Sequence, residues 1–414
     1  MELSFKTGKR TETVQIEDSR LMGILEPEDL PEGIDENAVV KGALKDPVDS
    51  KPLHELISSD ETVAIITSDI TRPCPSWKIL PSILEELDRA GVKKENITVV
   101  FGLGSHRRQT EDEKKHLAGD EVYAQVRCID SNPDDTVHVG TTKRGTPVDI
   151  DRTVMEADRR ICIGNVEYHY FAGYSGGAKA LMPGVSTRSA IQANHRFMVK
   201  PESCAGKLEG NPVREDIEEA GAMAGIDFIF NVVLNTKKEI VYAACGDVTA
   251  AHRKACRYLD QYYLRQIDEK ADIVIVSQGG APKDLNLYQT QKALDNAGQA
   301  VKEGGAVIVC GSCAEGFGES HFEEWMLKYR NPHDMTEEIQ RNFILGAHKA
   351  AAIAMIREKA DIYLVSDMDS ETVRKTILTP ASSLQEAYDL ALKTRPDAKV
   401  LAMPYGGSTL PSIK

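Results

Sequence analysis

The densest group of side chains that could do chemistry lies in the segment His169–Ala180, which reads HYFAGYSGGAKA. A lysine in a glycine-rich loop can use its amine covalently, and the backbone N–H groups of such a loop can hold a phosphate. Gly173 and Lys179 have the spacing of a P-loop, but Ala178 replaces its second glycine and Ala180 replaces its magnesium-binding serine or threonine. The sequence therefore predicts a loop that presents one lysine and is not a P-loop. A flexible loop without function is the alternative.

Two shorter motifs follow predicted strands in the first half of the chain. Asp69-Ile-Thr-Arg72 follows an apolar run, and an arginine there can bind a carboxylate or a phosphate bidentately. The run GLGSH ends at His106 after the next strand, where a histidine could act as a general acid or base. The structural alternatives are an Asp–Arg pair that caps the next helix and a histidine used only in packing.

The second half carries one candidate motif, GGAPKDLNLYQTQK, which begins at Gly279 after an apolar run. Tyr288, Gln289 and Lys292 fall at the start of a predicted helix, where they can share one face. A tyrosine, an amide and an ammonium on one face suit a small anionic substrate. Solvated polar residues at a helix N-terminus are the alternative.

Cysteine and histidine spacing gives no metal site. Eight cysteines in 414 residues are too sparse for a disulfide scaffold. Cys310 and Cys313 form a C-x-x-C pair, but a structural zinc site would need a second pair. Packed thiols at the end of a strand are favoured over a redox pair.

Short apolar runs alternate with amphipathic patterns along most of the chain. Predicted strands include 61–69, 96–106, 271–279, 304–311 and 360–367, and a predicted helix at 76–91 ends at Gly91. Strands that recur with intervening helices indicate an α/β fold with largely parallel sheets flanked by helices. Such sheets bind ligands beyond the carboxyl ends of their strands, which is where the motifs above lie.

The length and the pattern predict two domains joined by a helical connector at about 250–268. The N-terminal domain, residues 1–260, carries the lysine loop and its histidines. The C-terminal domain, residues 268–392, carries the tyrosine, glutamine and lysine motif. We expect the last segment, 396–414, to pack back on the N-terminal domain.

Composition limits the function classes. The chain has 50 Lys and Arg against 64 Asp and Glu, a formal net charge of −14, which argues against a nucleic-acid-binding surface. No apolar stretch approaches the roughly 20 residues that span a bilayer, and the N-terminus MELSFKTGKR has no signal-peptide core. We expect a cytoplasmic protein that binds neither nucleic acid nor membrane.

The motifs, taken together, resemble those of the nickel-pincer-nucleotide lactate racemase family. The match is collinear over nearly the whole chain and comprises Asp69–Arg72, Gly102–His106, His169–Gly184, Asn194–His195 and Gly279–Lys292. The resemblance implies a two-domain α/β isomerase that racemises or epimerises lactate or a related 2-hydroxy acid. It implies a nickel-pincer nucleotide, pyridinium-3-thioamide-5-thiocarboxylic acid mononucleotide with Ni(II), and maturation proteins that build this cofactor.

The resemblance also implies a role for each matching residue. Lys179 would attach the cofactor, and His195 would be the protein ligand of nickel. His106 and His169 would be the two acid/base residues. The substrate would contact Arg72, Tyr288, Gln289 and Lys292. The nucleotide would contact Asp69, Ser175, Gly176, Gly177 and Ala178.

The implied reaction is chemically reasonable for these side chains. The Cα–H of a 2-hydroxy acid is a poor acid, so its removal as hydride is easier when a base takes the hydroxyl proton. The resulting 2-keto acid is planar and can receive hydride on either face. Two histidines allow the site to serve both enantiomers.

Two other function classes remain open on the sequence. A nucleotide-dependent ligase or kinase would use the glycine-rich loop, although its P-loop positions are missing. A non-catalytic binder of small anionic metabolites would need the cationic residues but not three histidines.

Arg107 and Arg108, directly after His106, could favour a substrate with a second carboxylate, but surface arginines are the preferred interpretation.

Overall fold

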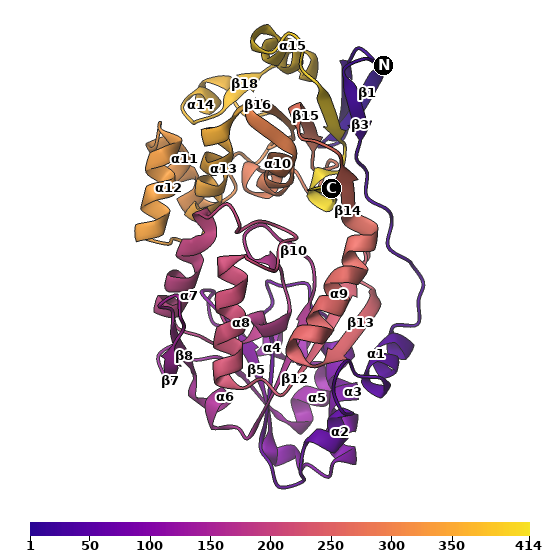
Figure 1. Cartoon of the computed structure of the whole chain (residues 1–414). Helices are drawn as coiled ribbons and strands as arrows, with labels where there is room; N and C mark the ends of the chain where they lie inside the picture. The colour runs from indigo at the N-terminus through magenta and orange to yellow at the C-terminus, as the bar shows by residue number, and fades with distance from the viewer. The chain divides into compact units, whose positions relative to one another are not determined.

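The computed structural model describes all 414 residues, which fall into two compact α/β units (Figure 1). The central unit comprises Asp29–Gln261, and the terminal unit comprises Met1–Glu28 together with Tyr262–Lys414. The chain passes from one unit to the other twice, after Glu28 and within helix α9 (Val248–Tyr263). Largely parallel sheets flanked by helices confirm the predicted fold class.

The central unit is built on a six-stranded sheet in the order β13-β12-β9-β4-β5-β6. Its neighbouring strands are parallel except for β12 and β13. The strands are β4 (Val63–Ser68), β5 (Ile97–Gly102), β6 (Arg127–Asp130), β9 (Arg159–Asn165), β12 (Phe228–Leu234) and β13 (Ile240–Gly246). The first five residues of β4 are buried, as expected for a middle strand that is covered on both faces.

Helix α3 (Ser76–Arg89) shows how the sequence covers this sheet. Its buried residues Ile79, Ile83 and Leu87 recur every four positions and form one apolar stripe, which packs in the same core as β4 and β5. The other helices of this unit are α1 (Glu36–Lys45), α2 (Leu53–Leu56), α4 (Glu111–Ala118), α5 (Asp120–Gln125), α6 (Arg152–Glu156), α7 (Arg188–His195) and α8 (Pro212–Ala224). Short 3-10 turns lie at η1 (Lys94–Asn96), η2 (Gly177–Ala180) and η3 (Arg196–Val199).

Two small antiparallel hairpins complete the central unit. They are β7 (Thr136–Thr141) with β8 (Pro147–Asp151), and β10 (Tyr168–His169) with β11 (Gly173–Tyr174). The second hairpin begins the lysine loop. Asp260 accepts hydrogen bonds from the hydroxyls of Tyr168 and Tyr174, both at 2.7 Å, so this hairpin is tied to α9.

The terminal unit has a second six-stranded sheet, which is parallel throughout and has the order β18-β17-β16-β15-β19-β3. Its strands are β3 (Leu21–Ile24), β15 (Ala271–Ser277), β16 (Val301–Cys310), β17 (Ala360–Val365), β18 (Thr379–Ala381) and β19 (Val400–Met403). Its helices are α10 (Leu287–Ala300), α11 (Ser320–Lys328), α12 (Pro332–Arg341), α13 (Ala347–Lys359), α14 (Ser370–Arg374) and α15 (Leu384–Thr394), with a 3-10 turn η4 (Gly406–Ser408). Two further strand pairs are β1 (Glu2–Thr7) with β2 (Arg10–Gln15) and β14 (Leu264–Ile267) with β20 (Leu410–Ile413).

The division of the chain differs from the expected domains at both ends. Residues 396–414 belong to the terminal unit, because β19 pairs with β15 on one side and with β3 on the other. All four residues of β19 are buried, which suits a strand inside a sheet. Residues 1–28, expected in the N-terminal domain, also belong to the terminal unit, and the predicted connector is α9 followed by β14.

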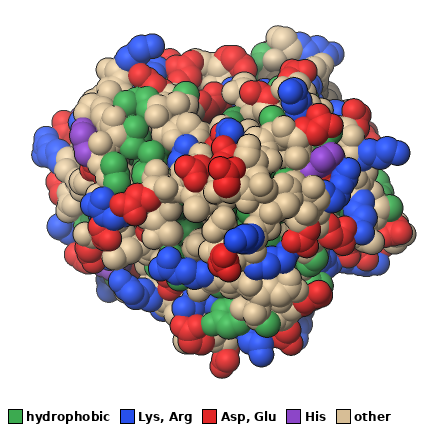
Figure 2. Space-filling model, turned by 90° about the horizontal axis from the view of Figure 1, so that it is seen from below, with side chains coloured by type: hydrophobic (Ala, Val, Ile, Leu, Met, Phe, Trp, Pro, Cys, Tyr) green, Lys and Arg blue, Asp and Glu red, His purple; other side chains and the backbone are tan.

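The surface in Figure 2 shows Lys and Arg interspersed with Asp and Glu, and its hydrophobic patches are small. Basic side chains do not gather into a stripe on this face. None of the helices combines the length and the apolar character that a membrane span requires.

Deletion of residues 400–414 tests the placement of β19 and β20. It exposes the edges of β15 and β3, so we expect the terminal unit to lose its protection against limited proteolysis. The Asp29–Gln261 segment should stay protected, as measured by mass spectrometry of the fragments. Deletion of Lys414 alone is the control, because this residue is exposed and its ion pair with Asp268 lies on the surface. A deletion that instead exposed the central unit would contradict this topology.

Candidate active site

Three predicted motifs meet where the strand order of the central sheet reverses. From β4 the chain adds β5 and β6 on one side, while β9 lies on the other side of β4. Asp69–Arg72 follows β4, Gly102–His106 extends from the end of β5, and His169–Ala180 follows β9. A reversal of this kind leaves a crevice at the carboxyl ends of the strands, which is the usual ligand site of an open α/β sheet.

His106 is oriented by a buried carboxylate. Its Nδ1 lies 2.7 Å from Oδ2 of Asp69, which is 2% exposed, and 3.2 Å from the hydroxyl of Thr71. The Thr71 hydroxyl donates to the other carboxylate oxygen of Asp69 at 2.8 Å. A carboxylate can only accept hydrogen bonds, so Nδ1 carries the proton and Nε2 is left with a lone pair. Asp69, expected to contact the nucleotide, thus has His106 as its partner.

Gln109 joins the loops that carry Asp69 and His106. Its Oε1 accepts the N–H of Ile70 at 2.8 Å, and its Nε2 donates to Asp130 on β6 at 2.9 Å. Arg107 forms a bidentate ion pair with Glu113 on the surface, in line with the interpretation of a surface arginine. The sequence reading did not single out Gln109, because an amide after a histidine motif has no distinguishing pattern.

Phe171 lies at the centre of the remaining site residues. The centre of its ring is 4.5 Å from that of His169, 4.9 Å from that of His195 and 5.9 Å from Nζ of Lys179. His195 ends α7, and Lys179 lies in η2. The structure therefore brings together one lysine and two of the three predicted histidines around a ring to which the sequence analysis gave no role.

The pKa values of Lys179 and His169 are both lowered. Burial, with the charges of Arg214 and Arg72, holds the pKa of Lys179 well below its ordinary value. Burial, with the charge of Arg72 as a further cause, also holds the pKa of His169 well below its ordinary value. Nδ1 of His169 accepts the N–H of Ala172 at 3.3 Å, so the proton of the neutral ring is on Nε2. A neutral amine is a nucleophile, and a neutral imidazole can accept a proton at one ring nitrogen and donate a hydrogen bond from the other.

Arg214 on α8 holds the loop in place. It is fully buried, and its guanidinium donates to the carbonyls of Ala172 at 3.0 Å, of Gly176 at 3.5 Å and of Tyr174. Burial lowers the pKa of Arg214 to about 10, so the side chain remains charged at neutral pH. Asn211, the N-cap of α8, adds a hydrogen bond to the carbonyl of Phe171 at 2.9 Å. Arg214 lies in an ordinary amphipathic helix, so no local sequence pattern marks it as a contact of the loop.

The loop is also packed tightly against its surroundings. At Gly173, with φ of 74°, a Cβ would lie 2.1 Å from the carbonyl oxygen of Lys207. The hydroxyl of Ser175 donates to the carbonyl of Asn165 at 2.7 Å, and the N–H of Gly177 donates to Asn231 at 2.9 Å. These two groups, expected to contact a nucleotide, therefore already have partners within the protein. The loop is a rigid platform and not a flexible segment.

His195 is the candidate metal ligand. It is 7% exposed, and its Nδ1 lies 2.9 Å from Oδ1 of Asn194. No group of three His, Cys, Asp or Glu side chains in the chain could hold a metal ion. A metal at His195 would therefore need ligands from another molecule, which fits a metal-carrying group attached to the neighbouring amine of Lys179.

The candidate substrate residues differ in exposure and in unit. Arg72, in the central unit, is exposed and forms no ion pair. In the terminal unit, Gln289 and Lys292 are exposed three residues apart on α10, so they share one face. Tyr288 is half-buried, with its ring against Phe322 and its carbonyl accepting a hydrogen bond from Lys349.

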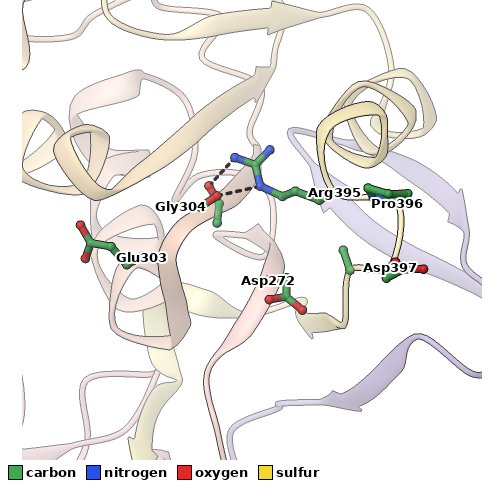
Figure 3. Close-up of a pocket in the computed structure, with 8 residues that line it drawn as sticks. Asp272, Glu303, Gly304, Arg395, Pro396 and Asp397 are labelled. Carbon is green, nitrogen blue, oxygen red and sulfur yellow. Dashed lines mark hydrogen bonds between the residues drawn. The ribbon is translucent and has the colours of Figure 1, made fainter.

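The terminal unit contains a cavity of about 330 Å³ near the amino ends of strands β15, β16 and β19 (Figure 3). It is lined by residues that include Asp272, Glu303 and Asp397, while Arg395 donates to the carbonyls of Gly304 and Gly305. The Arg395 guanidinium is thus hydrogen-bonded to backbone carbonyl groups of the protein itself. This cavity contains none of the predicted site residues.

Arg214→Met should loosen the lysine loop. The variant leaves three carbonyls without their donor, at about 1–3 kcal/mol each, offset in part because a charge is no longer buried. We expect a loss of about 3 kcal/mol in the free energy of unfolding and faster hydrogen exchange in residues 168–180. Arg214→Lys is the matched control, because it keeps the charge but lacks the planar fork of donors, so its exchange should also rise. Unchanged hydrogen exchange of residues 168–180 in both variants would show that Arg214 does not hold the loop.

The lowered pKa of Lys179 should appear in the pH dependence of acylation. A lysine reacts only as the free amine, so the rate for an exposed lysine rises about tenfold per pH unit below its pKa. Lys237 is the internal control, since its hydrogen bond to Glu32 raises its pKa. We expect the acylation rate at Lys179 to level off at a lower pH than the rate at Lys237, measured by peptide mass spectrometry after acetic anhydride pulses. Parallel profiles would show that Lys179 is protonated like a surface lysine.

Comparison with known proteins identifies the family. Residues 7–206 match the lactate racemase N-terminal domain, and residues 267–410 match the lactate racemase C-terminal domain. The lactate racemase of Thermoanaerobacterium thermosaccharolyticum is 33% identical over 417 residues, covering 97% of each chain, and that of Lactiplantibacillus plantarum is 31% identical over 412 residues, covering 96% of each. The structure of the lactate racemase apoprotein from T. thermosaccharolyticum matches with a TM-score of 0.87, at 30% identity and full coverage of both chains. The chain therefore belongs to the lactate racemase family and is an isomerase.

Proposed function

We propose that this protein racemises lactate or a related 2-hydroxy acid with the help of a nickel-pincer nucleotide attached to Lys179. The observation that carries the proposal is the cluster of Lys179, His169 and His195 around Phe171, in which burial lowers the pKa of Lys179. The two relatives named above are lactate racemases, which supports lactate as a substrate.

The chain offers two groups to such a cofactor. Lys179 supplies a neutral amine for attachment, and His195 supplies Nε2 as a ligand for nickel. When bound, the cofactor provides a site that accepts hydride from the substrate carbon and returns it. Imidazole and sulfur ligands suit nickel in a square-planar geometry.

The two remaining histidines handle the hydroxyl proton. Nε2 of His106 can take this proton, and the adjacent Asp69 carboxylate stabilises the imidazolium that forms. In the neutral His169 ring the proton on Nε2 can donate a hydrogen bond to the substrate oxygen. As the second acid/base residue, His169 returns a proton to the oxygen only from its imidazolium form, which leaves the neutral ring. A proton taken by one histidine is thus balanced by a proton returned from an imidazolium, and the roles exchange when the opposite enantiomer reacts.

Cationic and polar side chains are proposed to bind the substrate. Arg72 can hold the carboxylate through two parallel hydrogen bonds, because its guanidinium is exposed and forms no ion pair. Gln289 and Lys292 are proposed for the hydroxyl and the carboxylate, with Tyr288 nearby. These assignments rest on the family resemblance and on the shared exposed face of α10.

The direct test is the intact mass of protein coproduced with the cofactor-building enzymes, with nickel measured on the same sample. We expect an adduct on the order of several hundred daltons that maps to Lys179, together with nickel. Lys179→Ala should carry neither the adduct nor activity. An unmodified, nickel-free wild-type protein from a host with proven cofactor supply would overturn the proposed cofactor.

Substitution of the histidines tests their roles separately from cofactor attachment. His106→Ala and His169→Ala should each lower kcat for lactate racemisation by about 10²- to 10⁴-fold while the Lys179 adduct remains. Asp69→Asn should lower kcat as well, because an amide no longer stabilises imidazolium at His106. Racemisation measured by chiral chromatography that stays at the wild-type rate in both histidine variants would exclude them as the acid and the base.

A further inference from the structure

The first two turns of α8 carry two buried charged residues of opposite sign, Arg214 and Asp216, each 0% exposed. Arg214 contacts the lysine loop, as described above. Asp216 contacts a different set of residues, namely Asn194 on α7 and the threonines Thr142 and Thr146 in the turn between β7 and β8. Figure 1 shows α8 beside α7 and this hairpin. Asp216 has no role in the proposed chemistry, and it forms no ion pair.

The carboxylate of Asp216 is held by three hydrogen-bond donors. Its Oδ2 accepts from Thr146 Oγ1 at 2.6 Å and from Asn194 Nδ2 at 2.8 Å, while its Oδ1 accepts from the hydroxyl of Thr142. A buried carboxylate without a cation is costly, and these donors offset the cost. Because a carboxylate can only accept, the Asn194 amide must present its NH₂ group to Asp216.

The orientation of Asn194 then decides the state of His195. With Nδ2 bound to Asp216 and to the carbonyl of Val213 at 3.1 Å, Oδ1 of Asn194 points to Nδ1 of His195 at 2.9 Å. An amide oxygen can only accept, so Nδ1 of His195 carries the proton. Its Nε2 keeps the lone pair that a metal ligand needs.

We propose that Asp216 is a positioning residue that acts through Asn194 to fix His195 in the tautomer with the proton on Nδ1. The Asp216 carboxylate can only accept, so the Asn194 amide must donate its N–H to it. The amide oxygen of Asn194 then faces His195 and accepts a hydrogen bond from Nδ1. The identity of the metal bound at Nε2 rests on the proposed function. The tautomer itself does not, because it follows from contacts within the protein.

The tautomer can be measured on the apoprotein by ¹⁵N imidazole NMR, at a pH where the ring is neutral. His195 is assigned from the signal that disappears in His195→Gln. We expect the wild-type ring to carry its proton on Nδ1. A wild-type ring with its proton on Nε2 would overturn the proposal without the need for any variant.

Asp216→Asn is the central variant. It replaces the acceptor with a group that can also donate, so the Asn194 amide can turn over and present its NH₂ to Nδ1 of His195. We expect the tautomer with the proton on Nε2 to appear in this variant. A folded Asp216→Asn protein whose His195 remains entirely in the Nδ1–H form would refute the role of Asp216.

Two further variants separate polarity from packing. Thr146→Val removes one donor to Asp216 but leaves the carboxylate as an acceptor, so His195 should keep its wild-type tautomer. Asn194→Ala removes the acceptor next to Nδ1 and should shift the tautomer even if Asp216→Asn does not fold. A tautomer change in Thr146→Val as large as in Asp216→Asn would indicate a general packing effect and would overturn the proposal.

Nickel retention gives a second readout in the holoprotein. Loss of an orienting partner of a metal ligand typically costs about 10- to 100-fold in metal affinity, so a chelator should remove nickel from Asp216→Asn more readily by that factor than from the wild type. The Lys179 adduct, followed by intact mass, should remain in both. If the wild type carries no nickel, the proposed cofactor fails, while the NMR result still decides the role of Asp216.

Discussion

Three carbonyl groups between Ala172 and Gly176 accept hydrogen bonds from one buried guanidinium, that of Arg214. The loop has positive φ angles at Gly173, Gly176 and Gly177, so no continuous helix or strand runs through it between the short strand β11 and the turn η2. Arg214 supplies these hydrogen bonds from a single side chain, and the loop in turn solvates a charge that has no carboxylate partner. The position of Lys179 depends on these hydrogen bonds between Arg214 and the loop carbonyls.

The same arrangement sets the electrostatics of the site. The chain has a net charge of −14, yet Arg214, Arg72 and Lys179 all act on the environment of His169. Burial, together with the nearby cations, lowers the pKa of the Lys179 amine and of the His169 imidazole.

Three histidines of the site differ in the partner of Nδ1. For His106 the partner is the carboxylate of Asp69, for His169 it is the backbone N–H of Ala172, and for His195 it is the amide oxygen of Asn194. Two of these partners accept a hydrogen bond and one donates a hydrogen bond, so Nε2 has a lone pair in His106 and His195 but a proton in His169. Side chains of one type thus differ in which ring nitrogen carries the proton because their neighbours differ.

The sequence by itself determined the α/β class, the strands β4, β5 and β9 and the motifs at their ends, because apolar periodicity and glycine spacing are local properties. Motif spacing also identified Lys179 and the histidines as candidates, since the topology of an open sheet places strand ends together. Only the tertiary structure decided that β19 and residues 1–28 join the terminal unit, because a strand pattern does not specify its partner. Only the tertiary structure revealed Arg214, Asp216 and Phe171, because their roles arise from burial and from contacts with residues distant in sequence.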